Sequence, residues 1–145
     1  MSNRSANQRR RQCAALPLSR EGEELRVLLV TSRETRRWVL PKGWIEKRVS
    51  PAAQAAQEAY EEAGIRGRIA KAPIGEYAYP KRLANGISVT CRVAVYPLEV
   101  EHLLESWPEM AERERRWFTL AEAAEAVQEG GLGSLMLGLA PPTTA

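Results

Sequence analysis

The chain has 145 residues, of which 44% are hydrophobic and 27% charged, and its formal net charge is +3. This length suits one domain with a sizeable core, and the composition is ordinary for a globular protein. The small positive charge does not by itself indicate a nucleic-acid-binding protein. The sequence has no apolar run long enough to span a membrane and no signal peptide, so we expect a cytoplasmic protein.

The first part of the chain predicts a basic tail followed by three strands. Residues 1–11 are polar and include three adjacent arginines, which predicts a flexible, solvated tail; a basic arm that touches RNA or phosphate is the alternative. We predict strands at 12–18, 25–31 and 38–40, and the apolar run 25–31 is expected to be buried on both faces. Residues 42–49 then form a loop that leads into a helix, a favourable setting for phosphate.

The helix after this loop has ends that the sequence marks clearly. Ser50 suits the N-cap, Pro51 the first helical position, and Gly64 the left-handed residue that ends the helix. Small residues recur at helical spacing inside it, at Ala52, Ala56, Ala59 and Ala63. We therefore predict a helix over 51–63 whose small face approaches a sheet closely.

Three glutamates lie on another face of this helix, where they are poorly placed for stability. Glu58, Glu61 and Glu62 are related by spacings of three and four, at which like charges repel by about 0.2–0.5 kcal/mol per pair. The last two also oppose the helix macrodipole, and no Lys or Arg lies between Pro51 and Gly64 to relieve them. A hard divalent cation such as Mg²⁺, which takes oxygen ligands, would remove this conflict. A solvated acidic face is the alternative.

Residues 43–65 resemble the Nudix box. That pattern is glycine, five residues, Glu, seven residues, Arg-Glu, an apolar residue, any residue, Glu-Glu, any residue, glycine and an apolar residue. The matching positions are Gly43, Glu58, Ala59, Glu61, Glu62, Gly64 and Ile65. Two positions depart from the pattern, because Val49 stands in place of the first Glu and Gln57 in place of the Arg.

The resemblance implies that Glu58, Glu61 and Glu62 bind Mg²⁺ or Mn²⁺, helped by a backbone carbonyl near Gly43. Bound metal would polarise a diphosphate and activate water. The resemblance leaves open where the general base lies, and Glu61 is one candidate. Because an acidic and a basic position are lost together, we hypothesise that a supporting ion pair is absent while the metal glutamates remain.

The C-terminal half predicts several more strands and a second helix. Strands are expected at 68–72, 75–79, 87–97 and 116–119, with a hairpin turn at 80–86 that ends in Asn-Gly. Thr119 can cap a helix over 120–128, which the Gly130–Gly131 pair would end, and a last helical piece is expected over 132–139. We predict a single domain over residues 12–140 and a frayed C-terminus at 141–145.

The remaining reactive side chains offer no second site. Cys13 and Cys91 lie in apolar runs without metal-ligand spacing, so we predict buried free thiols. His102 is the single histidine and sits beside a glutamate in a polar stretch, which predicts a surface position.

Strands, a helix, more strands and final helices suit a mixed β-sheet covered on both faces. The resemblance likewise implies an α/β fold, the Nudix-type α/β/α sandwich. Outside the box, the runs SRETRRWVLPKG and RRWFTLAEAAEAV resemble the diphosphoinositol polyphosphate phosphohydrolase branch, which also acts on diadenosine polyphosphates.

Basic side chains flank the box and are candidates for binding a phosphate chain, because guanidinium and ammonium groups engage phosphate well. The substrate-binding candidates are Arg36, Arg37, Lys42, Gly43, Lys81 and Arg82, of which Lys42 is preferred because it adjoins the box glycine. A further hypothesis is that three aromatic residues stack on a base of the substrate. These are Trp44, Tyr77 and Tyr79, for which packing at the core or rim is the alternative.

The expected function is hydrolysis of a diphosphate bond in a nucleoside, dinucleoside or inositol polyphosphate, with Mg²⁺ or Mn²⁺ as cofactor. Two alternatives stay open. One is an RNA-end pyrophosphohydrolase, which is the one case in which nucleic acid would be a substrate. The other is a non-catalytic ligand-binding or regulatory domain, to which Val49 and Gln57 lend weight.

Overall fold

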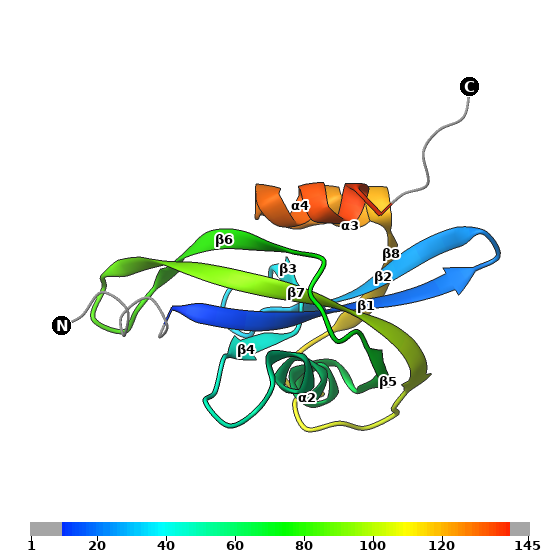
Figure 1. Cartoon of the computed structure of the whole chain (residues 1–145), viewed down its shortest axis with the longest axis horizontal. Coiled ribbons are helices and arrows are strands. Elements are labelled where there is room, and N and C mark those ends of the chain that lie inside the picture. The colour runs from blue at the N-terminus through cyan, green and yellow to red at the C-terminus, as the bar shows by residue number, and fades with distance from the viewer. Residues whose placement is uncertain (1–9, 140–145) are drawn as a thin grey trace.

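A central mixed sheet organises the protein, seen here in a computed structural model that describes residues 10–139 (Figure 1). The strands are β1 (Arg11–Glu21), β2 (Glu24–Thr31), β3 (Trp38–Val39), β4 (Lys42–Trp44), β5 (Ile65–Ile69), β6 (Gly75–Arg82), β7 (Ser88–Leu103) and β8 (Arg115–Thr119). The helices are α2 (Pro51–Ala63), α3 (Leu120–Ala126) and α4 (Gly130–Leu137). Helix α2 covers one face of the sheet and α3 and α4 cover the other, which confirms the predicted α/β/α sandwich (Figure 1).

The sheet is held together by its two longest strands, β1 and β7. They pair in parallel from Arg11↔Arg92 to Leu18↔Glu99, whereas the other pairs are antiparallel. The strand order is β3-β2-β1-β7-β5, with β4 joined to β1, β6 to β7 and β8 to β2. The N-terminal strand therefore lies at the centre of the sheet, next to a strand that begins more than seventy residues later.

Side-chain alternation along the central strands produces two cores. In β2, Val27 and Leu29 pack towards α3 and α4, while Leu28 and Val30 pack towards α2. Because successive side chains of a strand point to opposite faces, a strand covered on both faces is apolar throughout. The expectation that 25–31 is buried on both faces is confirmed for residues 27–31, whereas Leu25 and Arg26 are half-buried.

Helix α2 has the predicted ends. The Ser50 hydroxyl accepts a hydrogen bond from the Ala53 N–H, and Gly64 adopts a left-handed φ of 66° at the C-cap. The fully buried alanines are Ala55, Ala59 and Ala63, so the small face that meets the sheet is centred on a row four residues apart. Ala52 and Ala56 of the predicted stripe are half-buried beside this row.

Several strand boundaries differ from the prediction. Residues 42–44 form β4 instead of loop, because they pair with the start of β1. Strand β5 begins directly after Gly64, three residues earlier than expected. Strands β6 and β7 both continue past a proline: Pro80 lies in β6, which pairs only with β7, and Pro97 lies between the parts of β7 that pair with β6 and with β5.

The C-terminal helices begin as predicted but divide differently. Thr119 and Glu122 form a reciprocal capping box at the start of α3. Helix α3 ends when Val127 turns to extended backbone, and the Gly130–Gly131 pair opens α4 instead of ending α3. None of the helices within residues 10–139 is long and apolar enough to cross a membrane, and the predicted compartment stays a prediction.

The predicted tail and frayed end fall mostly outside the described residues. Strand β1 begins at Arg11, inside the predicted tail, and its guanidinium pairs with Glu76. Residues 1–9 and 140–145 are not described, so the division into tail, domain and frayed end stays a prediction. Cys13 and Cys91 are fully buried and free, and His102 is exposed, as predicted.

Candidate active site

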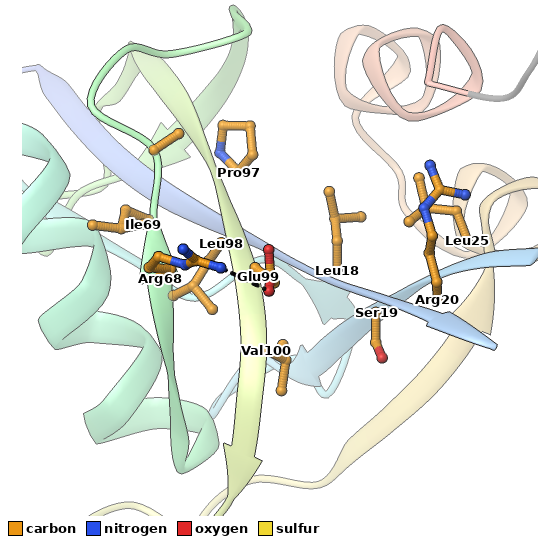
Figure 2. Close-up of a pocket in the computed structure, with 11 residues that line it drawn as sticks. Leu18, Ser19, Arg20, Leu25, Arg68, Ile69, Pro97, Leu98, Glu99 and Val100 are labelled. Carbon is orange, nitrogen blue, oxygen red and sulfur yellow. Dashed lines mark hydrogen bonds and ion pairs between the residues drawn. The ribbon is translucent and has the colours of Figure 1, made fainter.

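Two cavities of similar volume lie in the described part of the chain, and their linings differ in chemistry. One, of about 680 Å³, lies beside the ends of β1, β5 and β7 and is lined largely by aliphatic side chains such as Leu18, Ile69 and Leu98 (Figure 2). The ion pair at its edge, between Arg68 and Glu99, is exposed to solvent. This cavity offers no paired acids, so the candidate active site is the second cavity.

The second cavity is an open cleft of about 650 Å³ that contains most of the predicted site. Its charged lining includes six acids and six bases. The acids are Glu34, Glu46, Glu58, Glu62, Glu109 and Glu129, and the bases are Arg33, Arg37, Lys42, Lys81, Arg82 and Arg113. Strand β4, helix α2, strand β6, the 104–114 segment and the α3–α4 junction all contribute to this cleft, so the fold gathers it from across the chain.

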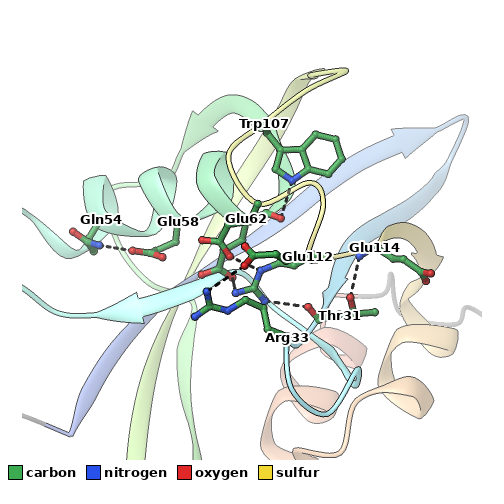
Figure 3. A network of polar contacts seen from close by, with 10 residues as sticks. Thr31, Arg33, Gln54, Glu58, Glu62, Trp107, Glu112 and Glu114 are labelled. Carbon is green, nitrogen blue, oxygen red and sulfur yellow. Dashed lines mark hydrogen bonds and ion pairs between the residues drawn. The ribbon is translucent and has the colours of Figure 1, made fainter.

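Glu58 and Glu62 lie on successive turns of α2 and face the cleft (Figure 3). Their carboxyl groups lie close enough together for each to shift the pKa of the other. The Gln54 amide, one turn earlier, donates a 2.6 Å hydrogen bond to Glu58 Oε2. Gly43 of β4 lies against the Glu58 carboxyl group. A Cβ at this glycine would lie 2.5 Å from both the carboxyl carbon and Oε2 of Glu58. The glycine is needed here because β4 approaches the glutamate so closely.

The electrostatics of these groups favour their neutral forms. Burial raises the pKa of Glu62 to about 8, against the opposing charge of Arg113, and the hydrogen bond and charge of Glu58 raise it further. Burial also raises the pKa of Glu58. Burial lowers the pKa of Lys42, and the charge of Glu62 opposes this shift. Two adjacent carboxyls that resist ionisation have too little positive charge beside them, so a divalent cation would suit this pair.

Glu61 differs from the other two glutamates, although its charge raises the pKa of Glu58. It does not line the cleft, and its backbone carbonyl accepts a 3.0 Å hydrogen bond from the Glu109 N–H. Within residues 10–139, no three His, Cys, Asp or Glu side chains are grouped closely enough to hold a metal ion. The oxygen chemistry of Glu58 and Glu62 suits a hard cation, whereas a role for Glu61 stays a prediction.

Arg113 joins α2 to the segment that follows β7. Its side chain is only 10% exposed; it makes a 2.7 Å ion pair with Glu109 and lies 3.8 Å from Glu62. It also donates a 3.0 Å hydrogen bond to the carbonyl of Thr31 at the end of β2. A buried guanidinium with three partners of this kind orients the end of the glutamate helix.

Two further side chains hold the same end of α2. Arg115 donates a 2.8 Å hydrogen bond to the Ala63 carbonyl. The Trp107 indole donates a 3.1 Å hydrogen bond to the Glu62 carbonyl (Figure 3). The Arg115 guanidinium stacks on the Trp107 ring at 3.9 Å. Val49 and Gln57 are exposed, so the helix is anchored through residues 107–115 and not through these two box positions.

The predicted substrate-binding residues divide into two groups. Arg37, Lys42, Gly43, Lys81 and Arg82 all line the cleft. Arg36 does not: it has a left-handed φ of 57°, and its guanidinium binds the Glu112 carbonyl and the Glu114 carboxylate. Arg36 therefore connects the turn in which it lies to the segment before β8, and these contacts stabilise the turn.

Two of the three candidate aromatic residues border the cleft. Lys42 Nζ lies 5.3 Å from the centre of the Tyr79 ring, and Lys81 Nζ lies 5.9 Å from that of Trp44. The Tyr79 hydroxyl donates a 2.7 Å hydrogen bond to Gln12. Tyr77 is 5% exposed and belongs to the core, so the packing alternative describes it.

Among the cleft residues that were not predicted as site residues are Gln54, Glu109, Arg113 and Glu129. Gln54 had a usable signal, because a position four residues before Glu58 lies on the same helix face. Glu109, Arg113 and Glu129 had none, since no local pattern places those segments against α2 or β4.

Comparison with known proteins identifies the family to which this arrangement belongs. The sequence pattern of the NUDIX domain matches residues 8–135. Nudix hydrolase 12, mitochondrial, from Arabidopsis thaliana is 35% identical over 105 residues, which are 70% of this chain and 52% of that protein. Human diphosphoinositol polyphosphate phosphohydrolase 3-beta is 32% identical over 121 residues, 82% of this chain and 70% of that protein. The chain spans about half the length of the plant relative.

Solved structures with low sequence identity share the fold. The Escherichia coli dihydroneopterin triphosphate pyrophosphohydrolase superposes with a TM-score of 0.68 at 14% identity, over 90% of this chain and 94% of that one. The Caenorhabditis elegans Ap4A hydrolase gives a TM-score of 0.63 at 17% identity, over 88% and 92% of the two chains.

Proposed function

Because the chain belongs to the Nudix family, we propose that it is a metal-dependent pyrophosphohydrolase that cleaves a diphosphate bond linked to another moiety. The observation that carries this proposal is the pair of adjacent carboxyl groups, Glu58 and Glu62, that face a cleft lined by basic side chains. Relatives named as diphosphoinositol polyphosphate phosphohydrolases support a phosphoanhydride substrate.

Different residues of the cleft are proposed to bind the metal and the phosphate chain. Glu58 and Glu62 would hold Mg²⁺ or Mn²⁺, with Glu61 as a further candidate ligand or base. When bound, such an ion polarises the phosphoanhydride and lowers the pKa of a water molecule. Arg37, Lys42 and Lys81 bind and orient the phosphate chain, because positioning and electrostatic stabilisation dominate phosphoryl chemistry.

The substrate class is proposed to be a nucleoside, dinucleoside or inositol polyphosphate. A panel of these compounds, tested with Mg²⁺ or Mn²⁺ for release of phosphate or cleaved nucleotide, tests the proposal directly. We expect turnover on at least one compound and none after chelation of the metal. Tight binding without turnover on any compound would favour a non-catalytic ligand-binding domain. Faster turnover of RNA 5′ ends, tested beside the panel, would favour an RNA-end pyrophosphohydrolase.

The carboxylate pair is tested by Glu62→Gln, which keeps size and removes the charge. We expect kcat to fall by more than about 100-fold, the upper end of what losing an outer partner of a metal ligand costs. Glu105→Gln, at an exposed glutamate outside the cleft, is the matched control and is expected to keep wild-type turnover. Metal-dependent turnover that survives Glu62→Gln would contradict the assignment.

A further inference from the structure

Glu129 carries an unpaired oxygen at the cleft. Among buried side-chain nitrogen and oxygen atoms of the described residues, Glu129 Oε2 is the one without a hydrogen-bond partner. Glu129 also lines the cleft that contains Glu58, Glu62 and Lys42. Since a buried acceptor is costly to leave unpaired, an orphaned oxygen at a binding cleft points to a donor supplied by the ligand.

The local backbone holds this carboxylate in place without using it. Glu129 is the N-cap of α4, but its side chain makes no cap hydrogen bond, while its carbonyl accepts a 3.1 Å bond from the Gly133 N–H. Val127 and Leu132, on either side, are buried in the core. Gln128 accepts a 2.6 Å hydrogen bond from Arg37, which anchors the same turn to the phosphate-binding side of the cleft.

Lys42 lies close enough for the charge of Glu129 to raise its pKa, but the two side chains do not form an ion pair. No ion pair between described residues includes Glu129 or Lys42, and the Lys42 ammonium lies over the Tyr79 ring. The N-terminus of α4 favours a negative charge at this position. Glu129, when ionised, is therefore an acceptor-only residue in the lining of the cleft.

We propose that Glu129 is a specificity-determining residue that accepts a hydrogen bond from an N–H or O–H group on the non-phosphate part of the substrate. The inference rests on the proposed hydrolase function and names its substrate class. A carboxylate attracts the amino group or hydroxyls of a nucleoside and repels phosphate. It therefore favours nucleoside-containing diphosphates over an inositol ring that carries phosphate on every carbon.

Calorimetric titration with three probes tests this assignment, in chelator so that neither metal nor hydrolysis contributes. The probes are adenosine diphosphate, inorganic pyrophosphate and inositol hexakisphosphate. In Glu129→Ala we expect adenosine diphosphate to bind about tenfold more weakly, the usual cost of a lost hydrogen bond to a charged group. Pyrophosphate, which has no other moiety, is expected to bind as to wild type, and inositol hexakisphosphate more tightly.

Glu129→Gln keeps an acceptor oxygen and removes the charge, so its loss of adenosine diphosphate affinity is expected to be smaller. Glu125→Gln, at an exposed position outside the cleft, is the matched control. Unchanged adenosine diphosphate binding in Glu129→Ala, or an equal loss for pyrophosphate, overturns the assignment. Wild-type protein that discriminates the probes through Glu129 but hydrolyses no compound of the panel refutes the proposed hydrolase and leaves Glu129 as a ligand-binding residue.

Discussion

At the scale of single residues, Gly43 shows how the backbone of one strand sets the position of the Glu58 carboxylate. A Cβ at this residue would lie 2.5 Å from the Glu58 carboxyl group, which is the mobile end of its side chain. We expect Gly43→Ala to displace the carboxylate and weaken Mn²⁺ binding by about 10–100-fold. The free energy of unfolding is expected to change little, because the carboxylate can move.

Mn²⁺ titration followed by calorimetry, with urea unfolding alongside, measures both effects of Gly43→Ala. Gly130→Ala is the matched control, because a Cβ there has no atom within 4 Å and Ala is the better helix former. Equal Mn²⁺ affinity in Gly43→Ala and wild type would show that Glu58 tolerates the added methyl group.

Arg113 and Glu62 test whether a buried charge pair organises the cleft. Their side chains are 10% and 8% exposed, so Arg113→Met leaves the buried Glu62 and the half-buried Glu109 without their cation. We expect this variant to lose about 3 kcal/mol of unfolding free energy when Glu62 is ionised, so urea denaturation is measured at about pH 9, above the Glu62 pKa of about 8. Adding Glu62→Gln should recover about 1 kcal/mol or more, because the two residues are coupled.

An exposed arginine provides the comparison for Arg113. Arg92 pairs with Glu76 at 3.6 Å, and its side chain is 67% exposed. Arg92→Met is expected to cost less than about 1 kcal/mol, as is usual for surface pairs. If the Arg113→Met and Glu62→Gln effects simply add, the buried pair does not contribute as a unit.

At the scale of elements, the start of α3 supplies a pH-dependent contribution to stability. The Glu122 carboxylate accepts a hydrogen bond from the Thr119 N–H, and this bond lowers the pKa of Glu122. A carboxyl whose pKa is lower in the folded state stabilises the fold above its unfolded pKa, and this contribution is lost as pH falls through the folded pKa.

Glu122→Gln isolates this charge, because Gln can also complete a capping box. We expect wild type to be more stable than the variant at about pH 7. The difference should shrink as pH falls below about 4.3, the ordinary Glu pKa, and vanish only below the lowered folded-state pKa of Glu122. Urea unfolding at low salt across this range measures it. Glu125→Gln, on the exposed last turn of the same helix, is the control. A difference that is constant with pH would mean that the charge plays no part.

The elements differ in how far the sequence predicts them. The limits of α2 and the start of α3 follow from Ser50, Gly64 and Thr119, because caps act within one helical turn. Strands β6 and β7 were predicted to end too early, at or before a proline. A proline stops a strand only where its missing N–H would face a partner strand. That condition depends on which strand lies beside it, and only the folded sheet specifies this.

At the scale of the whole molecule, metal binding and folding stability are linked. A ligand that binds only the folded state raises the free energy of unfolding by about 2.7 kcal/mol when present at 100 times its dissociation constant. Because the cleft combines segments from β4, α2 and β6, the unfolded chain does not retain it. We therefore expect Mg²⁺ or Mn²⁺ to stabilise the protein and chelation to remove the gain.

Urea unfolding with metal or with chelator, at equal ionic strength, measures this linkage. The Glu58→Gln, Glu62→Gln double variant should lose the metal-dependent gain, whereas Glu105→Gln should keep it. An undiminished gain in the double variant would place the metal elsewhere on the protein.

The sequence by itself determined the parts of this site that depend on local spacing. The glutamates of α2, its caps and the nearby Gly43 lie within 22 residues, and helix geometry relates Glu58 to Glu62 wherever the helix packs. The tertiary structure decided which groups meet them. Arg113 reaches Thr31 across 82 positions, and Glu129 reaches the cleft from the α3–α4 junction. Such contacts depend on the register of the sheet and on the parallel pairing of β1 with β7, which no local pattern encodes.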